Sequence, residues 1–325
     1  MAFTPLLPFD SFTDREWVEH TNTTEKIIEF CQNIGLIPIS PTTPCAKQHN
    51  NWYMGACARS RDKYLWRCRT CKSTRSIRDG TFFSKSKLEL RQVIDLLFYW
   101  SQCNDSHEHL RRHCKFASES TIVDWKNFMR DICATYFLLH PPTIGGVGHI
   151  VEIDESSWTK RKYNVGRVVN NQWVFGGTDR ITHECFAVLV DRRDAATLLP
   201  IIYQYILPGT TIHSDQWAAY NNIRNGPHHY IHFTVNHSQN FVDPLTLTHT
   251  QNIENMWMCA KMKKKRQMGQ HVTLLQTHLT EFMWRRRFGD RPFENMTLSI
   301  LYLHQNQIED KGSQGLADGL KENKL

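Results

Sequence analysis

The sequence contains no long hydrophobic run. Nowhere do 18 apolar residues follow one another, so it predicts no membrane-spanning helix. Its first twenty residues also lack the basic stretch and following apolar stretch that are typical of a secretory signal. We therefore expect a chain that is neither secreted nor inserted in a membrane. We expect it in the nucleus if the source is a eukaryote, and otherwise in the cytoplasm.

The chain does not lack the material for a packed core. Hydrophobic residues make up 40% of it and aromatic residues 11%, which argues against global disorder. A length of 325 residues suits two or three domains. The formal net charge of +7 favours an anionic partner, and nucleic acid is the common one.

The first half of the chain divides into three segments. Residues 1–40 form an N-terminal helical segment, with a helix expected over 12–35. Residues 41–85 hold several cysteines and many basic residues but little helical periodicity. Residues 86–142 then predict three helices, which contain LELRQVIDLLFYW, HEHLRRHCKF and ESTIVDWKNFMRDICATYFLL, the last capped by Ser118 or Ser120.

Residues 147–290 have a different sequence pattern, in which strand-like runs alternate with helical ones. Strands are expected in GHIVEIDES, QWVFGGTD, ECFAVLVDRR, TTIHSD and HHYIHFTV. Helices are expected in DAATLLPIIYQYIL, capped by Asp194, and over 250–267 and 271–287. Three strands, a helix, a strand, a helix or turn, a further strand and then helices predict a mixed α/β sheet layered by helices, the order of a ribonuclease-H-like fold.

Three acids in this region are candidate metal ligands. Asp154 is expected at the end of one strand, Asp215 at the end of another and Glu254 on a helix. Acids that converge from different elements need a positive charge between them, and oxygen ligands suit Mg²⁺ or Mn²⁺. Two such ions can clamp the attacking and leaving oxygens of a phosphodiester. Spacing alone does not choose these acids over their neighbours Glu152, Glu155, Asp179, Asp191 and Asp194.

A basic run follows the third acid. Lys261 lies seven residues after Glu254, nearly two helical turns, so both side chains are expected on one helix face. A lysine at that place could contact a DNA phosphate, or it could simply begin a solvated basic face. The next four basic residues are candidate contacts to a nucleic-acid backbone: Lys263, Lys264, Lys265 and Arg266.

These blocks resemble the DDE transposases of the IS1595 family and the eukaryotic Merlin elements, which share the ISXO2-like transposase domain. The resemblance runs in order through VEIDESSW, WVFGGTDR, VDRRDAATLLPII, PGTTIHSDQWAAY and HTQNIENMWMCAK, and SIRDGTFFSKSKLEL upstream adds to it. It implies a ribonuclease-H-like core with Asp154, Asp215 and Glu254 as the metal-binding triad and Lys261 as the accompanying lysine. Asn252 is a further candidate near the third acid.

The resemblance also implies a reaction and its partners. A transposase cleaves double-stranded DNA at the terminal inverted repeats of its element, and the freed 3′ hydroxyl attacks target DNA. Such enzymes act as homo-oligomers on paired ends. A domesticated copy that binds DNA without cutting it remains an alternative, and so does another nuclease of the same fold. We interpret Trp217 and Tyr220 as packing residues first and DNA contacts second.

The cysteine-containing segment predicts a degenerate zinc ribbon. Cys68 and Cys71 form a CxxC pair with basic neighbours, and Cys45 stands near the place of a second pair. The resemblance implies a second cysteine where Thr42 stands, so either Cys57 or His49 would have to complete four ligands of a Zn²⁺ ion. A decayed ribbon with two buried thiols is the alternative.

Two other segments carry further predictions. The three helices after the ribbon fit a helix-turn-helix-like unit that binds DNA, with Arg111 and Arg112 as candidate contacts or, equally, as a solvated helix face. Residues 296–325 resemble one leucine-rich repeat. Because a single repeat cannot bury its own core, we interpret this tail as a fusion remnant or as a gene model that runs into a neighbouring locus.

Overall fold

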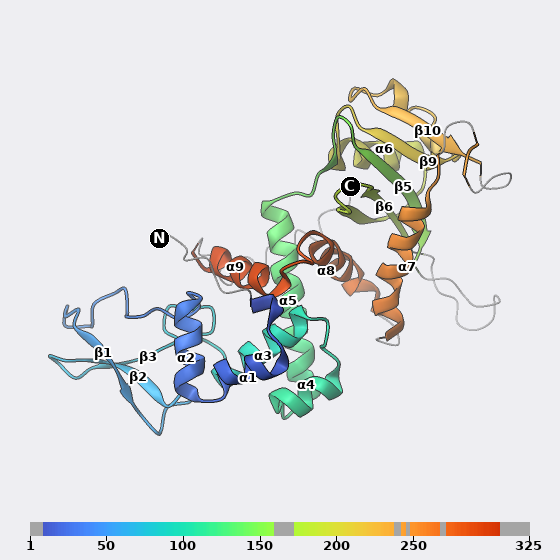
Figure 1. Cartoon of the computed structure of the whole chain (residues 1–325). Coiled ribbons are helices and arrows are strands. Elements are labelled where there is room, and N and C mark those ends of the chain that lie inside the picture. The colour runs from blue at the N-terminus through green and yellow to red at the C-terminus, as the bar shows by residue number, and fades with distance from the viewer. Residues whose placement is uncertain (1–8, 159–171, 237–241, 245–247, 267–270, 306–325) are drawn as a thin grey trace. The chain divides into compact units, whose positions relative to one another are not determined.

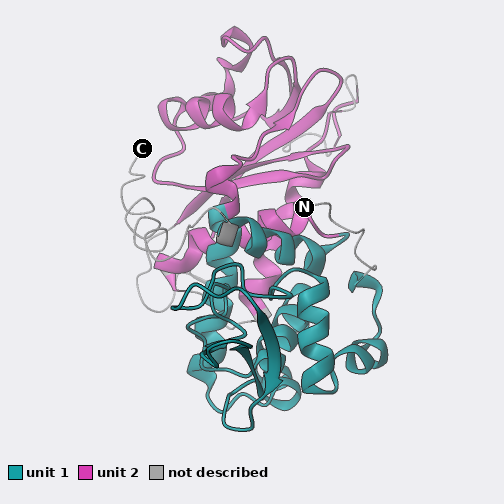
Figure 2. Cartoon of the chain, turned by 90° about the vertical axis from the view of Figure 1, so that its left-hand side faces the viewer, with its two compact units in different colours: residues 1–135, 290–325 teal, residues 136–289 magenta. Residues whose placement is uncertain are grey.

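The computed structural model describes residues 9–158, 172–236, 242–244, 248–266 and 271–305 (Figure 1). The chain divides into two compact units (Figure 2). The first contains residues 1–135 together with 290–325, and the second contains residues 136–289. The predicted boundary after residue 142 therefore falls earlier, within a long helix, and the chain returns to the first unit near its end.

The N-terminal helices form part of the first unit. A short 3-10 helix, η1 (Phe9–Ser11), precedes α1 (Asp14–Thr21) and α2 (Thr24–Asn33). The single helix expected over 12–35 is broken because the Thr23 side chain accepts the backbone N–H of Lys26, which starts a new helix. Trp17 stacks on Phe98 at 4.0 Å and so joins α1 to the core of this unit.

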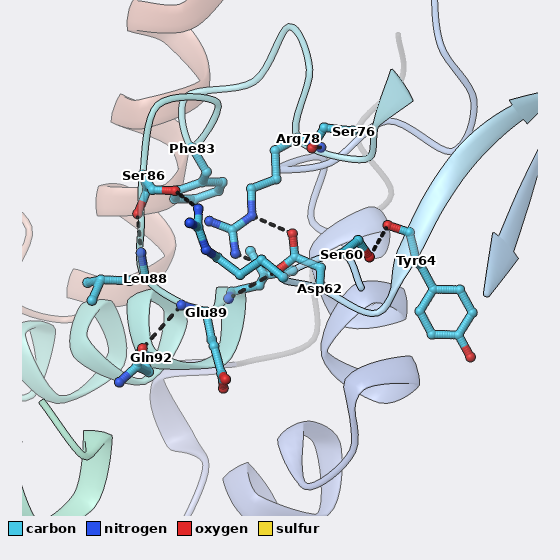
Figure 3. A network of polar contacts seen from close by, with 12 residues as sticks. Ser60, Asp62, Tyr64, Ser76, Arg78, Phe83, Ser86, Leu88, Glu89 and Gln92 are labelled. Carbon is cyan, nitrogen blue, oxygen red and sulfur yellow. Dashed lines mark hydrogen bonds and ion pairs between the residues drawn. The ribbon is translucent and has the colours of Figure 1, made fainter. Parts of the chain in front are cut away.

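A three-stranded antiparallel sheet follows, made of β1 (Trp52–Ala56), β2 (Tyr64–Cys68) and β3 (Thr74–Ser76). A buried ion pair joins it to the next helix (Figure 3). Arg78 Nε donates to Asp62 Oδ2 over 2.6 Å, and a second guanidinium nitrogen contacts Oδ1 of the same carboxylate. That carboxylate also accepts the backbone N–H of Leu90, at the start of the helix, over 3.4 Å. The carboxylate of Asp62 thus joins the three-stranded sheet to that helix through buried contacts to Arg78 and Leu90.

The three helices after the ribbon lie where the sequence predicts them. They are α3 (Leu90–Ser101), α4 (His107–Cys114) and α5 (Glu119–Leu139). Ser106 caps α4 by accepting the N–H of His109. Ser118, one of the two serines considered, accepts the N–H of Thr121 in the first turn of α5.

The start of the predicted leucine-rich repeat has a different structure. Residues 292–305 form helix α9 (Pro292–Gln305), which belongs to the first unit. Asp10 accepts the N–H groups of Phe293 and Glu294 at the start of this helix, and Ile300 is fully buried. The expectation of a separate repeat is therefore wrong for residues 296–305, because their apolar side chains complete a helical core. Residues 306–325 lie outside the described residues.

The second unit is built on a five-stranded mixed sheet. Its strands are β5 (Ile150–Ser157), β6 (Trp173–Asp179), β7 (Cys185–Val190), β9 (Thr211–Asp215) and β10 (Ile231–Val235). The order across the sheet is β10-β9-β5-β6-β7, with antiparallel pairing from β5 to β7 and parallel pairing from β5 to β10. This is the sheet of the ribonuclease-H-like fold, as the sequence predicts.

Helices cover both faces of this sheet. Tyr205, at the end of α6 (Ala195–Tyr205), stacks on Phe186 at 4.8 Å. On the opposite face, Trp257 of α7 (Gln251–Arg266) lies so close to Gly176 that a Cβ atom there would be 2.7 Å from the indole ring. Because Phe186 pairs with Gly177, it points away from the face that carries Gly176. Glycine at 176 therefore allows α7 to lie directly on the sheet.

The remaining elements of this unit are short or peripheral. Helix α8 (Leu275–Arg287) follows the 3-10 helix η5 (Val272–Leu274), and the Met283 sulfur of α8 accepts the N–H of Ala187 in β7. The others are β4 (Ile144–Gly145), β8 (Ile206–Leu207), η3 (Ala218–Tyr220) and η4 (Ile223–Asn225). In the part of the chain that the structure describes, no helix is long and apolar enough to cross a membrane.

Candidate functional site

Two of the predicted acids lie side by side on the sheet. Glu152 of β5 pairs with His213 of β9 in parallel register. Continuing that register by two residues places Asp154 beside Asp215, with both side chains on the face that α7 covers. Asp215 ends its strand as predicted, whereas Asp154 lies in the middle of β5, which continues to Ser157.

The electrostatics of this pair favour a cation between the two carboxylates. Burial is the largest cause that raises the pKa of Asp154 to about 7, and the neighbouring carboxylates of Glu155 and Asp215 contribute to the same rise. Carboxylates that destabilise one another's charged form in this way are stabilised by a cation between them. The donors are oxygens only, which fits Mg²⁺ or Mn²⁺ better than a softer metal.

Helix α7 is attached to β5 along one face of the strand. Three alternate residues of β5, which point to the same side, each accept a hydrogen bond from successive turns of the helix. The pairs are Asn252 Nδ2 with Glu152 Oε1 (2.7 Å), Trp257 Nε1 with Asp154 Oδ2 (3.1 Å), and Lys261 Nζ with Ser156 Oγ (2.6 Å). Asn252 thus contacts Glu152 and serves to hold the helix.

The third predicted acid and its lysine belong to the same helix. Glu254 is exposed and lies one turn before Trp257, the residue that reaches Asp154. Lys261 follows one turn after Trp257 and is half-buried, and burial together with nearby Lys264 lowers its pKa. The helix therefore presents Glu254 and Lys261 on either side of its contact with Asp154.

Three other acids near the candidate triad form structural hydrogen bonds. Glu155 points to the opposite face of β5 and accepts the hydroxyl of buried Tyr220 over 2.5 Å. Asp179 is buried and accepts two backbone N–H groups of the turn that follows β6. Asp194 caps α6 by accepting the N–H of Thr197, as the sequence predicts. These contacts explain the three acids without a role in catalysis.

The basic run at the end of α7 is not one uniform surface. Lys263 forms an ion pair with the fully buried Glu281, and Lys264 donates to the backbone carbonyl of Trp158 over 2.5 Å. Lys265 is exposed, and the side chain of Arg266 lies outside the described residues. The predicted strip of four DNA contacts is therefore divided, because two of its lysines are bonded within the unit.

The two arginines predicted to bind DNA lie on α4. Both are exposed, and Arg111 contacts Glu119 of α5 over 3.3 Å. An exposed ion pair of this kind contributes little to stability and is easily exchanged for a phosphate contact. The arrangement leaves Arg111 and Arg112 available at the surface.

Four side chains of the ribbon form a compact cluster. The ligand atoms of Cys45, His49, Cys68 and Cys71 all lie within 4.8 Å of one another. Cys45 Sγ is 3.5 Å from both Cys71 Sγ and His49 Nδ1, and Cys68 Sγ is 3.8 Å from that nitrogen. Tetrahedral zinc with Zn–S bonds of about 2.3 Å separates its sulfur ligands by roughly 3.7 Å. The cluster thus has the donor set and spacing of a Cys₃His zinc site.

The predicted ligand Cys57 is not part of this cluster, so that prediction is wrong. In the register of the hairpin, Cys68 pairs with Trp52, whereas Cys57 follows Ala56 at the other end. The four residue steps between those ends span about 13 Å. His49, the alternative considered from the sequence, takes the place instead, and its position four residues after Cys45 is the signal that favours it.

Comparisons with known proteins agree with the predicted family. Residues 147–287 match the family model of the ISXO2-like transposase domain. An uncharacterized transposase-like protein of Haemophilus influenzae is 28% identical over 100 residues, which cover 31% of this chain and 78% of that protein. The male abnormal protein mab-31 of Caenorhabditis elegans is 27% identical over 160 residues, 43% of this chain but only 36% of that protein.

Solved structures similar to this chain include two retroviral integrases. The HTLV-2 integrase catalytic core domain in complex with magnesium aligns with 43% of this chain and 84% of its own, at 10% identity and a TM-score of 0.28. A chain of the simian T-cell lymphotropic virus intasome in complex with PP2A regulatory subunit B56 gamma aligns with 45% and 51%, at 15% identity and a TM-score of 0.30. Residues 147–287, which make up most of the second unit, are therefore identified as an ISXO2-like transposase domain.

Proposed function

We propose that this protein is a DDE transposase that cleaves DNA at the ends of a transposable element and joins those ends to target DNA. The observation that carries the proposal is the pair Asp154 and Asp215 on adjacent parallel strands, covered by the helix that bears Glu254. The family match over residues 147–287 supports the same reaction class. DNA is then the substrate, and a second copy of the chain is the expected partner.

In this proposal Asp154, Asp215 and Glu254 hold two Mg²⁺ or Mn²⁺ ions. When bound, such ions supply activation of water or of a DNA 3′ hydroxyl and neutralise charge on the leaving oxygen. The protein's own contribution is orientation. The indole N–H of Trp257 fixes one oxygen of Asp154, which leaves the other for a cation. Lys261, held by Ser156, offers its ammonium group to a DNA phosphate beside the acids.

The first unit would recognise the terminal repeats. We propose that Cys45, His49, Cys68 and Cys71 hold one structural Zn²⁺ ion, which would stabilise the small sheet β1–β3. The exposed Arg111 and Arg112 on α4 would contact DNA phosphates, and the exposed Lys265 would do so in the second unit.

A second function is favoured by a specific observation. The ribbon has only three cysteines in its cluster, and one of the two relatives, male abnormal protein mab-31, is not named as a transposase. A transposase-derived protein that binds DNA without cutting it would need the DNA-binding first unit but not the three acids of the second unit. A measurement of DNA cleavage and joining by the full-length protein distinguishes the two functions.

The decisive experiment measures strand transfer by the purified full-length protein on labelled duplexes taken from the DNA flanking its coding sequence, with Mg²⁺ or Mn²⁺. Joined products should appear with the wild type and fall to background in Asp154→Asn, Asp215→Asn and Glu254→Gln. Glu155→Gln is the matched control, because that carboxylate lies on the other face of β5. Binding without nicking by the wild type would instead establish the DNA-binding function, and neither binding nor nicking would overturn both.

A further inference from the structure

One arginine contacts the two strands that carry Asp154 and Asp215 and the segment just before the helix that carries Glu254. Arg180 directly follows β6 and is only 19% exposed in its side chain. Its guanidinium group makes three hydrogen bonds to three different segments of the second unit. They join Nε to Glu152 Oε1 (2.6 Å), one terminal nitrogen to His213 Nδ1 (3.1 Å), and the same nitrogen to the carbonyl oxygen of His249 (2.9 Å).

The positions of these acceptors relate them to the acids. Glu152 precedes Asp154 by two residues on β5, and His213 precedes Asp215 by two residues on β9. Side chains two apart on a strand share a face, so Arg180 lies beneath the acid pair on the same side of the sheet. The third acceptor, His249, lies just before α7, which carries the third acid five residues later.

The carboxylate of Glu152 extends this connection into the helix. It is fully buried, and its Oε2 accepts the backbone N–H groups of Asn252 (2.8 Å) and Ile253 (3.0 Å). Those N–H groups belong to the first turn of α7, where a helix has unsatisfied donors and favours negative charge. Arg180 supplies the counter-charge that allows an ionised carboxylate to stay in that place.

We propose that Arg180 is a positioning residue, which sets the spacing of Asp154, Asp215 and Glu254 by tying β5, β9 and the start of α7 to one guanidinium group. This role rests on the proposed function, since it concerns the same three acids. Arginine suits it because its planar group donates in several fixed directions, whereas a lysine ammonium is a single point on a flexible stem. The sequence shows Arg180 only as the last letter of WVFGGTDR.

A buried arginine can also serve stability alone, and the same unit offers a matched control. Arg285 on α8 is 15% exposed and donates through Nε to the fully buried Glu281 over 2.8 Å. This pair resembles Arg180 and Glu152 in burial and in its Nε–carboxylate contact, but Glu281 pairs with Lys263 near the end of α7, whereas Glu152 binds the first turn of that helix. Lysine substitutions at the two positions therefore remove similar interactions at different places.

The test compares Arg180→Lys and Arg285→Lys in the full-length protein. Mn²⁺ binding is titrated by electron paramagnetic resonance, and the contribution that disappears in Asp154→Asn is taken as the acid site. We expect Arg180→Lys to weaken this binding about tenfold or more, the range for residues that orient metal ligands. Arg285→Lys should leave it within about twofold at a similar loss of thermal stability. Hydrogen exchange at the amides of Asn252 and Ile253 should accelerate only in Arg180→Lys.

The outcomes separate the two proposals. Equal effects of both lysine variants on Mn²⁺ binding and on hydrogen exchange would make Arg180 a residue of stability alone and overturn the inference. Mn²⁺ binding that depends on Asp154 and weakens only in Arg180→Lys, without any strand transfer by the wild type, would overturn the proposed function while supporting the role of Arg180. If the wild type shows no such Mn²⁺ binding, unchanged exchange in the first turn of α7 would overturn the inference too.

Discussion

Trp257 donates its indole N–H to Asp154 Oδ2 over 3.1 Å, which joins the middle of α7 to the middle of the central strand β5. The same ring lies against Gly176 of β6. One aromatic side chain thus both orients a candidate metal ligand and sets how closely the helix approaches the sheet. Stability and the geometry of the acids are therefore linked at this residue.

Substitutions at these two positions should couple. Trp257→Phe removes the hydrogen bond to the carboxylate and should lower the free energy of unfolding by about 1–3 kcal/mol. Gly176→Ala should cost about 1–3 kcal/mol, because its Cβ would lie 2.7 Å from the indole and 2.8 Å from the carbonyl oxygen of Phe186. Urea unfolding of both single variants and the double variant measures these costs.

The smaller phenylalanine ring should relieve part of the clash at Gly176. The cost of Gly176→Ala should therefore be lower in the Trp257→Phe background by more than about 0.5 kcal/mol. Strictly additive costs would contradict the contact that we describe.

The cysteine–histidine cluster should hold zinc in the purified protein. We expect about one zinc per chain by elemental analysis, and strong loss of that metal in Cys71→Ser and His49→Ala, because each removes one of four ligands. A strong chelator should lower the melting temperature of the wild type. Cys57→Ser is the control, since Cys57 lies at the far end of the hairpin, and it should retain the metal. Equal loss of zinc in Cys57→Ser and Cys71→Ser would refute this ligand set.

The buried pair in the first unit should be sensitive to removal of one partner. Arg78→Met leaves the carboxylate of Asp62 buried without its counter-charge and should cost about 3–5 kcal/mol, measured by urea unfolding. Arg111→Met is the control, because Arg111 and its partner Glu119 are 57% and 63% exposed and such a pair contributes at most about 1 kcal/mol. A cost for Arg78→Met no larger than that of the control would show that the pair in Figure 3 does not fix the ribbon to α3.

Asp194 should prove to be a helix cap. Asp194→Ala should lower the free energy of unfolding by about 0.5–2 kcal/mol, since the N–H of Thr197 loses its side-chain acceptor, while Asp194→Asn should retain most of the stability. Both variants should still perform strand transfer if the proposed function holds. Loss of product in Asp194→Asn at unchanged stability would instead make this acid part of the chemistry.

Much of the secondary structure could be predicted from local sequence patterns. The strands of the second unit and the three helices after the ribbon lie close to their predicted places, because alternation, helical periodicity and capping residues such as Asp194 act within a few residues. The ordered blocks over roughly residues 149–267 predicted the transposase family, and the family match over residues 147–287 confirms it. The assignment of Asp154, Asp215 and Glu254 as a triad stays a prediction.

Only the tertiary structure decided which residues meet. Nothing near Cys45 in the sequence rules out Cys57, yet the register of the hairpin separates them and brings His49 in. The apolar pattern of residues 296–305 did not reveal that they complete a helical core with residues near the other end of the chain. Likewise Arg180 gained its three partners from segments 28, 33 and 69 residues away. Sequence patterns report preferences over a few neighbouring residues, whereas long-range contacts are set by how whole elements pack, so the sequence by itself determined the elements and the family, and packing determined the sites.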